Sequence, residues 1–389
     1  MNISNKINTK DICLLQVLPH LNSGGMVSGA IEVANFLKKE KGKSIVISSG
    51  GYRESEILRN GCISLKIPLE TKNPFLIYRN RNILIEVIKK YSVNIVHARS
   101  RAPAWSAFLA TKLTKTIFVT TFHGTYGTQN FFKKKYNSVM LESDAIIAIS
   151  KFIKLHINKE YKKFDKIHVI PRGVDGSMFS PSKVTAERII SVAKKIQNDD
   201  LKRTILLPGR LTSWKGHEIA IRAVSLIKDM DLKLIILGDT QKKNSYKNYL
   251  LSLVNKLEVQ DKILFLDHTR DLPAFMMLSD LVISCSTKPE AFGRIILEAQ
   301  AMGCPVLAFN HGGSVELIKD NKNGILSKPF DICEFSKNIR KLLSLNTKER
   351  KQIATDSTLN VKKKYLTSAM CKKTIKLYKE LILKHKNYD

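Results

Sequence analysis

Short apolar runs alternate with longer amphipathic stretches along almost the whole chain. In the first half, the apolar runs predict strands at residues 12–18, 44–48, 94–97, 117–122, 145–149 and 167–170. A second series predicts strands at residues 204–207, 233–237, 263–266, 281–284 and 305–309. Strands that alternate with helices pair in parallel through helical crossovers. The pattern therefore predicts an α/β protein with two tandem Rossmann-like, doubly wound domains.

A break in this alternation marks the expected domain boundary. Residues 175–200 contain Pro181, several serines and a charged stretch, but no clear strand. We therefore expect an N-terminal Rossmann-like domain at residues 1–180, a linker at 181–200 and a C-terminal Rossmann-like domain at 201–366. The tail, residues 367–389, predicts a basic amphipathic helix that packs back on the N-terminal domain. Such domains bind ligands at the carboxyl ends of their strands, so we expect an interdomain cleft.

The chain is strongly basic, with 65 Lys and Arg against 34 Asp and Glu and a net charge of +31. This excess favours a polyanionic partner such as nucleic acid, an anionic membrane or a phosphorylated ligand. The abundance of Lys, Ile and Asn fits a biased genome equally well. No apolar stretch predicts a signal peptide or a transmembrane helix. The six cysteines lack C-x-x-C spacing, so neither zinc nor disulfides are expected, and we predict a cytoplasmic protein.

A glycine-rich loop follows the first expected strand. It contains three glycines, among them Gly25, and leads into a helix expected at residues 30–39. Backbone N–H groups of such a loop can approach an anion at a helix N-terminus, which makes Gly25 a candidate donor-binding residue. A tight turn with a purely structural role is the alternative. Ala30 and Ile31 stand where a P-loop requires Lys and Ser or Thr, so the loop does not predict an ATPase.

Two cations follow the first strand of the second series. Arg210 lies just beyond the strand expected at 204–207, and Lys215 comes five residues later. A guanidinium and an ammonium group can together neutralise a diphosphate. Taken alone, the segment is equally compatible with two solvated surface cations.

A turn and a helix follow the strand expected at 281–284. Gly293 permits a sharp turn, and residues 294–302 are expected to be helical, so the first backbone N–H groups of this helix suit a phosphate. Glu298 lies within the helix and suits the hydroxyls of a ribose, whereas Glu290 precedes it and suits those of a sugar. Two surface glutamates are the alternative, but it is weakened by the basic pair in the same domain. The candidate donor-binding residues here are Phe292, Gly293, Arg294, Ile295 and Glu298.

The order of these patterns resembles family 4 of the retaining glycosyltransferases, which have the GT-B architecture of two Rossmann-like domains. The patterns are Gly-Arg and Lys-Gly within 209–216, Glu-x7-Glu-Ala at 290–299, Gly-x-Pro-Val at 303–306 and Gly-Gly-x-x-Glu at 312–316. The resemblance extends from about residue 17 to 326. It departs from the family at Cys285, where Pro is frequent, and at Asp267, where Gly is common, which leaves the nucleotide base open.

The resemblance implies roles for the candidate residues. Arg210 and Lys215 would bind the diphosphate of a nucleotide-sugar donor, Glu298 its ribose, and Glu290 the transferred sugar. Thr-Thr-Phe-His-Gly at 120–124 resembles the family segment whose His reaches the donor sugar, so His123 and Glu290 are the catalytic candidates. Hexosyl transfer with retention of the anomeric configuration is expected, without a metal or any other cofactor.

The acceptor is expected to be a bacterial envelope glycolipid or the lipopolysaccharide core, bound near residues 97–105 and 123–132. Phe131 and Phe132, followed by three lysines, predict peripheral contact with an anionic membrane on its inner, cytoplasmic face. Two alternatives remain at this point. One is a basic nucleic-acid-binding protein, although charge alone does not explain the paired glutamates, so no nucleic-acid partner is expected. The other is a GT-B-fold nucleotide-sugar epimerase.

Overall fold

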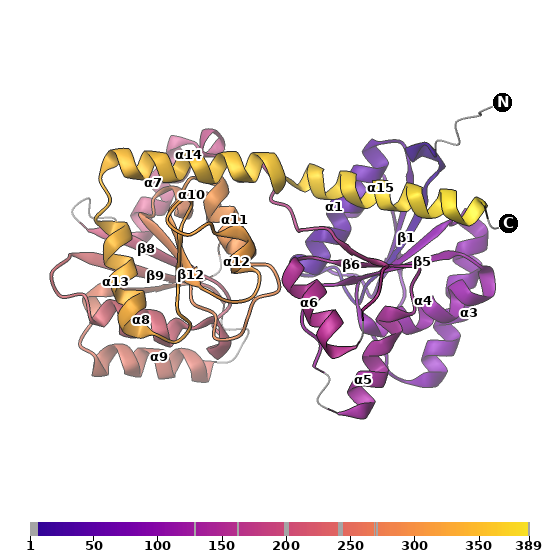
Figure 1. Ribbon diagram of the computed structural model, residues 1–389, viewed down its shortest axis with the longest axis horizontal. Helices are drawn as coiled ribbons and strands as arrows, with labels where there is room; N and C mark the ends of the chain where they lie inside the picture. The colour runs from indigo at the N-terminus through magenta and orange to yellow at the C-terminus, as the bar shows by residue number, and fades with distance from the viewer. Residues whose placement is uncertain are drawn as a thin grey trace. The chain divides into compact units, whose positions relative to one another are not determined.

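The computed structural model describes residues 7–127, 130–161, 163–197, 202–239, 244–267, 269 and 271–387. The chain divides into two compact units. The first contains the chain up to Gly173 together with the C-terminal segment from Thr367, and the second is Val174–Leu366. Each unit is a sheet of parallel strands with helices on its faces (Figure 1). The predicted class, two Rossmann-like α/β domains, is confirmed.

The first unit is built on a seven-stranded sheet with the order β3-β2-β1-β4-β5-β6-β7. Every neighbouring pair is parallel. The interior strand β1 is buried along its whole length, as expected for a strand covered on both faces. The strands are β1 Cys13–Val17, β2 Lys43–Ser48, β3 Ile63–Lys66, β4 Ile95–Ala98, β5 Ile117–Phe122, β6 Ala145–Ala148 and β7 Ile167–Val169.

The last helix of the chain completes the core of the first unit. α15 packs against α1 and β5, and its Tyr378 is fully buried among the side chains of the sheet. The buried hydroxyl of Tyr378 has a hydrogen-bond partner, because it lies 2.5 Å from His97 Nδ1. The helices of this unit are α1 Gly25–Lys39, α2 Glu54–Leu58, α3 Pro74–Tyr91, α4 Arg101–Thr114, α5 Phe131–Ser138, α6 Lys151–Glu160 and α15 Thr367–Lys386.

The second unit has a six-stranded parallel sheet with the order β10-β9-β8-β11-β12-β13. β8 occupies the interior, between β9 and β11, so the loops that follow β8 and β11 leave the sheet side by side. The strands are β8 Arg203–Pro208, β9 Leu232–Leu237, β10 Ile263–Leu266, β11 Leu281–Ser284, β12 Val306–Phe309 and β13 Ile325–Ser327.

A large apolar core, which includes Phe309 and Phe335, lies between this sheet and the helices α8, α9 and α13. The rings of these two phenylalanines meet edge to face at 5.2 Å. The helices are α7 Ala186–Ile196, α8 His217–Ser225, α9 Asn244–Lys256, α10 Leu272–Met277, α11 Arg294–Ala301, α12 Ser314–Leu317, α13 Ile332–Leu343 and α14 Thr347–Lys364. None of the helices in the described ranges is both long and apolar enough to cross a membrane.

The expected linker at residues 181–200 is not a separate segment, and the boundary does not follow residue 180. The second unit already begins at Val174, which pairs with Leu366 at the other end of the same unit. Most of the supposed linker is helix α7, which packs against α10. Arg188 of α7 forms a bidentate ion pair with the Asp271 carboxylate. Val192 and Ile196 are buried, so amphipathic packing makes this charged stretch part of the domain.

Three details of the chain differ from the sequence prediction. β3 and β13 were not expected; both are short strands at the edges of their sheets, and Ser64 interrupts the apolar run of β3. α1 begins at Gly25 rather than at residue 30, so Gly25 and Gly29 belong to the helix. A Cβ added to Gly29 would meet the Arg172 guanidinium at 1.9 Å, which shows that this glycine makes room for a buried side chain.

Candidate active site

The loops after β8 and β11 are packed backbone against backbone. Gly216 ends the loop after β8 with a φ of 76° and caps α8. A Cβ at Gly216 would lie 1.9 Å from the carbonyl oxygen of Cys285, the residue that follows β11. Thr287 also donates its N–H to the Trp214 carbonyl at 2.8 Å. The glycine therefore allows the segments that carry Lys215 and Glu290 to approach each other.

Lys215 and Glu290 form the central ion pair of this region. Lys215 Nζ lies 2.7 Å from Glu290 Oε1, and both side chains are largely buried, with 16% and 18% exposed. The Ser286 hydroxyl donates to the same carboxylate oxygen at 2.6 Å, and the ammonium group lies 4.5 Å from the centre of the Trp214 ring. Burial alone would raise the pKa of Glu290, but the charge of Lys215 and the hydrogen bonds from Lys215 and Ser286 outweigh it and lower the pKa. Glu290 is therefore ionised at neutral pH.

The backbone of Glu290 is held by a pair of glycines after β12. Gly313 donates its N–H to the Glu290 carbonyl at 2.8 Å. A Cβ at Gly312, where φ is 63°, would lie 2.6 Å from that same oxygen, and a Cβ at Gly313 would lie 2.5 Å from Phe292 Cα. From the sequence alone, the Gly-Gly pattern indicates only the family resemblance. Its physical role here is to let one loop lie directly on the other.

The helix expected after Gly293 is present. α11 is Arg294–Ala301, and Gly293 caps it with a φ of 91°. The first N–H groups of a helix have no partner within it, so this end of α11 offers donors to an anion. The Phe292 side chain is buried and lies against Tyr365, with the ring centres 6.3 Å apart. Phe292 can thus contribute to a donor site through its backbone, not through its ring.

Glu298 forms an ion pair within α11 with Arg294, one helical turn earlier. Arg294 Nη2 lies 2.8 Å from Glu298 Oε1, and only 7% of the Glu298 side chain is exposed. Arg294 and Glu298 thus partly neutralise each other. Arg210, by contrast, is exposed, and within the described residues no ion pair or hydrogen bond engages its guanidinium group. Arg210 is the cation of this set that remains available to a ligand.

His123 belongs to the first unit and directly follows β5. Its Nε2 is buried and has no hydrogen-bond partner in the described part of the chain. Burial lowers the pKa of His123 well below its usual value, and the positive charges of Arg172 and Arg99 lower it further. The imidazole is therefore neutral at physiological pH and can exchange a hydrogen bond with a ligand. Gly25 also belongs to this unit, as the first residue of α1.

Part of the expected acceptor segment is interior. His97 is fully buried; its Nδ1 contacts the Tyr378 hydroxyl and its Nε2 lies 2.6 Å from Thr121 Oγ1. Arg99 is also buried and donates from Nε to Gln16 Oε1 at 2.9 Å. The polar atoms of these two residues thus serve the packing of α15 and β1, and the location of an acceptor near this segment stays a prediction. Two later residues of the segment, Arg101 and Trp105, donate hydrogen bonds to α5.

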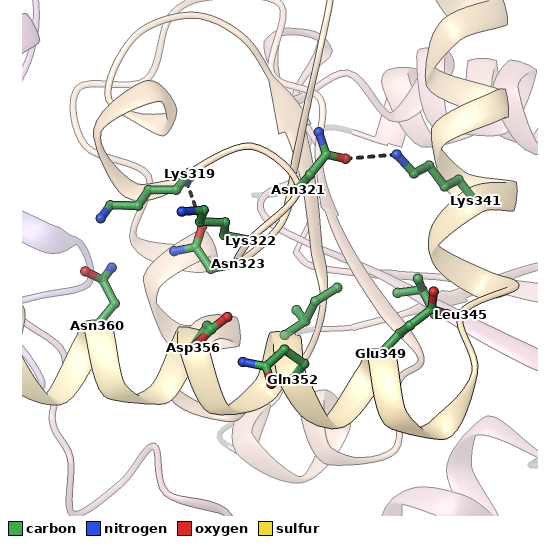
Figure 2. Close-up of a pocket in the computed structure, with 11 residues that line it drawn as sticks. Lys319, Asn321, Lys322, Asn323, Lys341, Leu345, Glu349, Gln352, Asp356 and Asn360 are labelled. Carbon is green, nitrogen blue, oxygen red and sulfur yellow. Dashed lines mark hydrogen bonds between the residues drawn. The ribbon is translucent and has the colours of Figure 1, made fainter.

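A groove elsewhere in the second unit contains none of the predicted site residues. It has a volume of about 650 Å³ and lies between the loop that follows α12 and the helices α13 and α14 (Figure 2). Lysines and carboxylates both line it, and Lys341 donates to Asn321 Oδ1 at 2.8 Å. Its mixed charge and open polar surface do not match the cationic set around Lys215. Among the described residues, no group of His, Cys, Asp and Glu is arranged to hold a metal ion.

The ion pair leads to a pH-dependent prediction for stability. In Lys215→Met, the Glu290 carboxylate stays largely buried without its cation, which should cost roughly 1–3 kcal/mol at pH 7. Because the native pKa of Glu290 is lowered, the pair stabilises the fold above the unfolded pKa of about 4.3 and ceases to do so as the pH falls through the native pKa. The difference between variant and wild type should therefore be largest at pH 7 and shrink once the pH falls below about 4. Urea unfolding can be followed through Trp214 with Trp105 replaced by Phe.

Lys202→Met is the matched control for this experiment, because Lys202 forms a looser pair with the mostly exposed Asp231 at 3.7 Å in the same unit. It should change the free energy of unfolding by less than about 1 kcal/mol. A cost for Lys215→Met that is the same at both pH values would show that Glu290 does not depend on Lys215 for its ionisation.

Comparison with known proteins assigns the chain to a family. Residues 190–358 match the family described as glycosyl transferases group 1, and residues 23–177 match glycosyltransferase family 4. A crystal structure of a glycosyltransferase from Rickettsia africae is 38% identical, covers 95% of this chain and 98% of its own, and superposes with a TM-score of 0.90. The Anabaena protein HepE, solved with UDP and glucose, has a TM-score of 0.82 at 19% identity, with 94% and 99% covered.

Among curated relatives, a glycosyltransferase of Methanocaldococcus jannaschii is 31% identical over 242 residues. That match spans 61% of this chain and 60% of the length of the relative. The two family matches cover the two units in turn, and the likeness to the Rickettsia structure extends over nearly the whole of both chains. The chain belongs to the group 1 glycosyltransferases of family 4 and has the GT-B fold.

Proposed function

We propose that this glycosyltransferase moves a hexose from a nucleotide-diphosphate-sugar to a lipid- or glycan-linked acceptor of the bacterial envelope, such as the lipopolysaccharide core. The observation that carries the donor half of this proposal is the set of groups gathered at one sheet edge of the second unit. It comprises the Lys215–Glu290 pair, the available guanidinium of Arg210, the start of α11 at Gly293 and the buried Glu298. Cations and helix N–H groups suit a diphosphate, and carboxylates suit the hydroxyls of ribose and sugar.

The proposed reaction retains the anomeric configuration and passes through an oxocarbenium-like transition state. Negative charge then develops on the leaving diphosphate, where Arg210, Lys215 and the N–H groups of residues 293–295 would stabilise it. A carboxylate beside a diphosphate would normally repel it. The 2.7 Å contact with Lys215 neutralises Glu290, so that its oxygens can face the sugar without this penalty. We propose departure and attack on the same face of the sugar.

Two residues of the first unit complete the proposed set. His123, as a neutral imidazole with a buried Nε2, would exchange a hydrogen bond with a hydroxyl of the transferred sugar. Gly25 would offer backbone contact at the start of α1. The relative HepE was solved with UDP and glucose, which makes UDP-glucose the first donor to try. GDP- and ADP-linked sugars should be tried beside it, because the sequence leaves the nucleotide base of the donor open.

Donor binding can be tested by replacing Glu298. Each hydrogen bond from a ribose hydroxyl to this carboxylate is expected to contribute about 1.5–3 kcal/mol, so nucleotide affinity in Glu298→Ala should fall by roughly tenfold or more. Titration calorimetry with the nucleoside diphosphate that gives the largest thermal shift measures this change. Glu218→Ala is the matched control, because Glu218 forms the same type of i,i+4 pair with Arg222 at 2.9 Å in α8. Unchanged affinity in a folded Glu298→Ala protein would overturn the donor assignment.

We further propose that no metal ion or other cofactor is required. Among the described residues, Arg210 offers an unpaired positive charge to the diphosphate, and the Lys215 ammonium group and the N–H groups at the start of α11 offer further hydrogen-bond donors. Turnover of the nucleotide sugar should therefore persist in the presence of EDTA, with less than about a twofold change. Complete loss of turnover that added Mg²⁺ restores would show that a cation shares this role.

A membrane-borne acceptor would bring the enzyme to the inner face of the cytoplasmic membrane, and α5 has the surface for such contact. Phe131 and Phe132 are 75% and 82% exposed, and the lysines at 133, 134 and 135 are also exposed. Aromatic rings enter the headgroup region and ammonium groups meet lipid phosphates. A second run of lysines, Lys362–Lys364, lies in α14 and belongs to the second unit.

Liposome co-sedimentation tests this contact. Each lysine near an anionic surface contributes on the order of 1 kcal/mol, so replacing Lys133, Lys134 and Lys135 by Ser should reduce binding to anionic vesicles strongly at low salt. The triple replacement of Lys362, Lys363 and Lys364 by Ser removes the same charge from exposed positions of the other unit and should have a smaller effect. Equal loss from both triples, or equal binding to neutral and anionic vesicles, would reject α5 as the contact.

A further inference from the structure

Two residues at the start of α4 fasten it to α5. Arg101 and Trp105 are four residues apart, so they share one face of α4. Arg101 Nη1 donates to Asn137 Oδ1 at 2.8 Å, and Trp105 Nε1 donates to the Tyr136 carbonyl at 3.2 Å. Both partners belong to α5. The spacing of Arg101 and Trp105 thus has a physical role, which is to attach α4 to α5. Neither residue belongs to the proposed donor site.

The same arginine reaches the loop between β5 and α5. Its guanidinium carbon lies 4.3 Å from the centre of the Tyr126 ring, a distance suited to a cation–π contact. Asn137, which accepts from Arg101, donates in turn from Nδ2 to the Gly127 carbonyl at 3.0 Å. The Tyr126 N–H donates to His156 Nε2 at 3.2 Å. Contacts therefore hold this loop at the Tyr126 ring, the Tyr126 N–H and the Gly127 carbonyl, and Arg101 takes part at the ring directly and at the carbonyl through Asn137.

The Tyr126 ring also lies 5.0 Å from the ring of Phe122, the last residue of β5, whereas the two glycines of the loop have few neighbours. A Cβ added to Gly124 or to Gly127 would meet no atom within 4 Å among the described residues. Segments with few packing contacts open at low free-energy cost, so their conformation depends on the few contacts that they have. The loop begins immediately after His123, whose Nε2 is buried and has no hydrogen-bond partner among the described residues.

We propose that Arg101 is a positioning residue for His123: by stacking on Tyr126 and orienting Asn137, it fixes the loop 124–127 and with it the imidazole. This inference rests on the catalytic role proposed for His123. It requires the planar guanidinium group, which stacks on a ring and donates sideways at the same time. Lysine in its place keeps the charge but cannot make both contacts, so charge and geometry can be separated.

Hydrogen exchange measured by mass spectrometry tests the structural half of the proposal without any substrate. In Arg101→Lys, peptides spanning residues 123–137 should exchange about tenfold faster or more than in the wild type. Arg81→Lys is the matched control, because Arg81 lies 4.9 Å from the Tyr78 ring and donates to Asn82 Oδ1 at 2.8 Å. All three of these residues belong to α3, so no loop depends on them. Unchanged exchange in Arg101→Lys would overturn the proposal.

Kinetics test the functional half. With a nucleotide sugar that the wild type turns over, kcat in Arg101→Lys should fall roughly ten- to a hundredfold, while the Kd for the nucleoside diphosphate stays within about twofold. Arg81→Lys should change neither. Equal losses in kcat and nucleotide affinity, or an unchanged kcat despite faster exchange, would contradict a positioning role. If Arg101→Lys does not fold, Tyr126→Leu removes the same stacking partner and is judged by the same measurements.

The outcome for Arg101 is separable from that for the proposed function. If the wild type turns over none of the nucleotide sugars, the proposed function fails, and the exchange experiment alone decides whether Arg101 holds the loop. If the wild type is active and exchange in Arg101→Lys is unchanged, only the positioning role is lost.

Discussion

The ion pair between Lys215 and Glu290 joins two loops that are far apart in the sequence but leave neighbouring strands of one sheet. The pair is possible only because the backbones on either side lie in direct contact. Gly216 lets one loop reach the Cys285 carbonyl, and Gly312 and Gly313 let the loop after β12 lie on Glu290 and Phe292. A side chain at any of these positions would force the loops apart. The chemistry of the second unit thus depends on close backbone packing at the carboxyl edge of its sheet.

This packing determines which charged groups of the site are in ion pairs and which remain available to a ligand. Lys215 neutralises Glu290, and Arg294 partly neutralises Glu298, so both carboxylates can lie near a diphosphate without strong repulsion. Arg210 remains exposed. The first unit contains two buried arginines, Arg99 and Arg172. Within the described part of the chain, Arg172 pairs with the Glu32 carboxylate, whereas Arg99 donates to the amide oxygen of Gln16. Burial lowers the pKa of His123, and the charges of Arg172 and Arg99 lower it further, so the imidazole is neutral and suits hydrogen bonding to a sugar better than ion pairing.

Much of this architecture could be predicted because parallel strands buried on both faces are apolar runs of recognisable length. The edge strands β3 and β13 could not be predicted, because short and partly polar edge strands are not continuous apolar runs. The turn at Gly293 and the helix after it followed from local residue preferences. The pairing of Lys215 with Glu290, the burial of Phe292 and the burial of His97 against Tyr378 did not, because each depends on a partner distant in the sequence. Periodicity reports which residues form an element, whereas side-chain partners depend on how elements meet.

The most direct test of the account is the chemistry itself, followed by nuclear magnetic resonance. The purified protein would be mixed with UDP-glucose, or with the nucleotide sugar that stabilises it most, in the presence and absence of a bacterial glycolipid extract. The account predicts release of the nucleoside diphosphate only with the extract, together with a glycoside that has the anomeric configuration of the donor. Conversion of the donor to an epimer without any acceptor, or a product of inverted configuration, would contradict it.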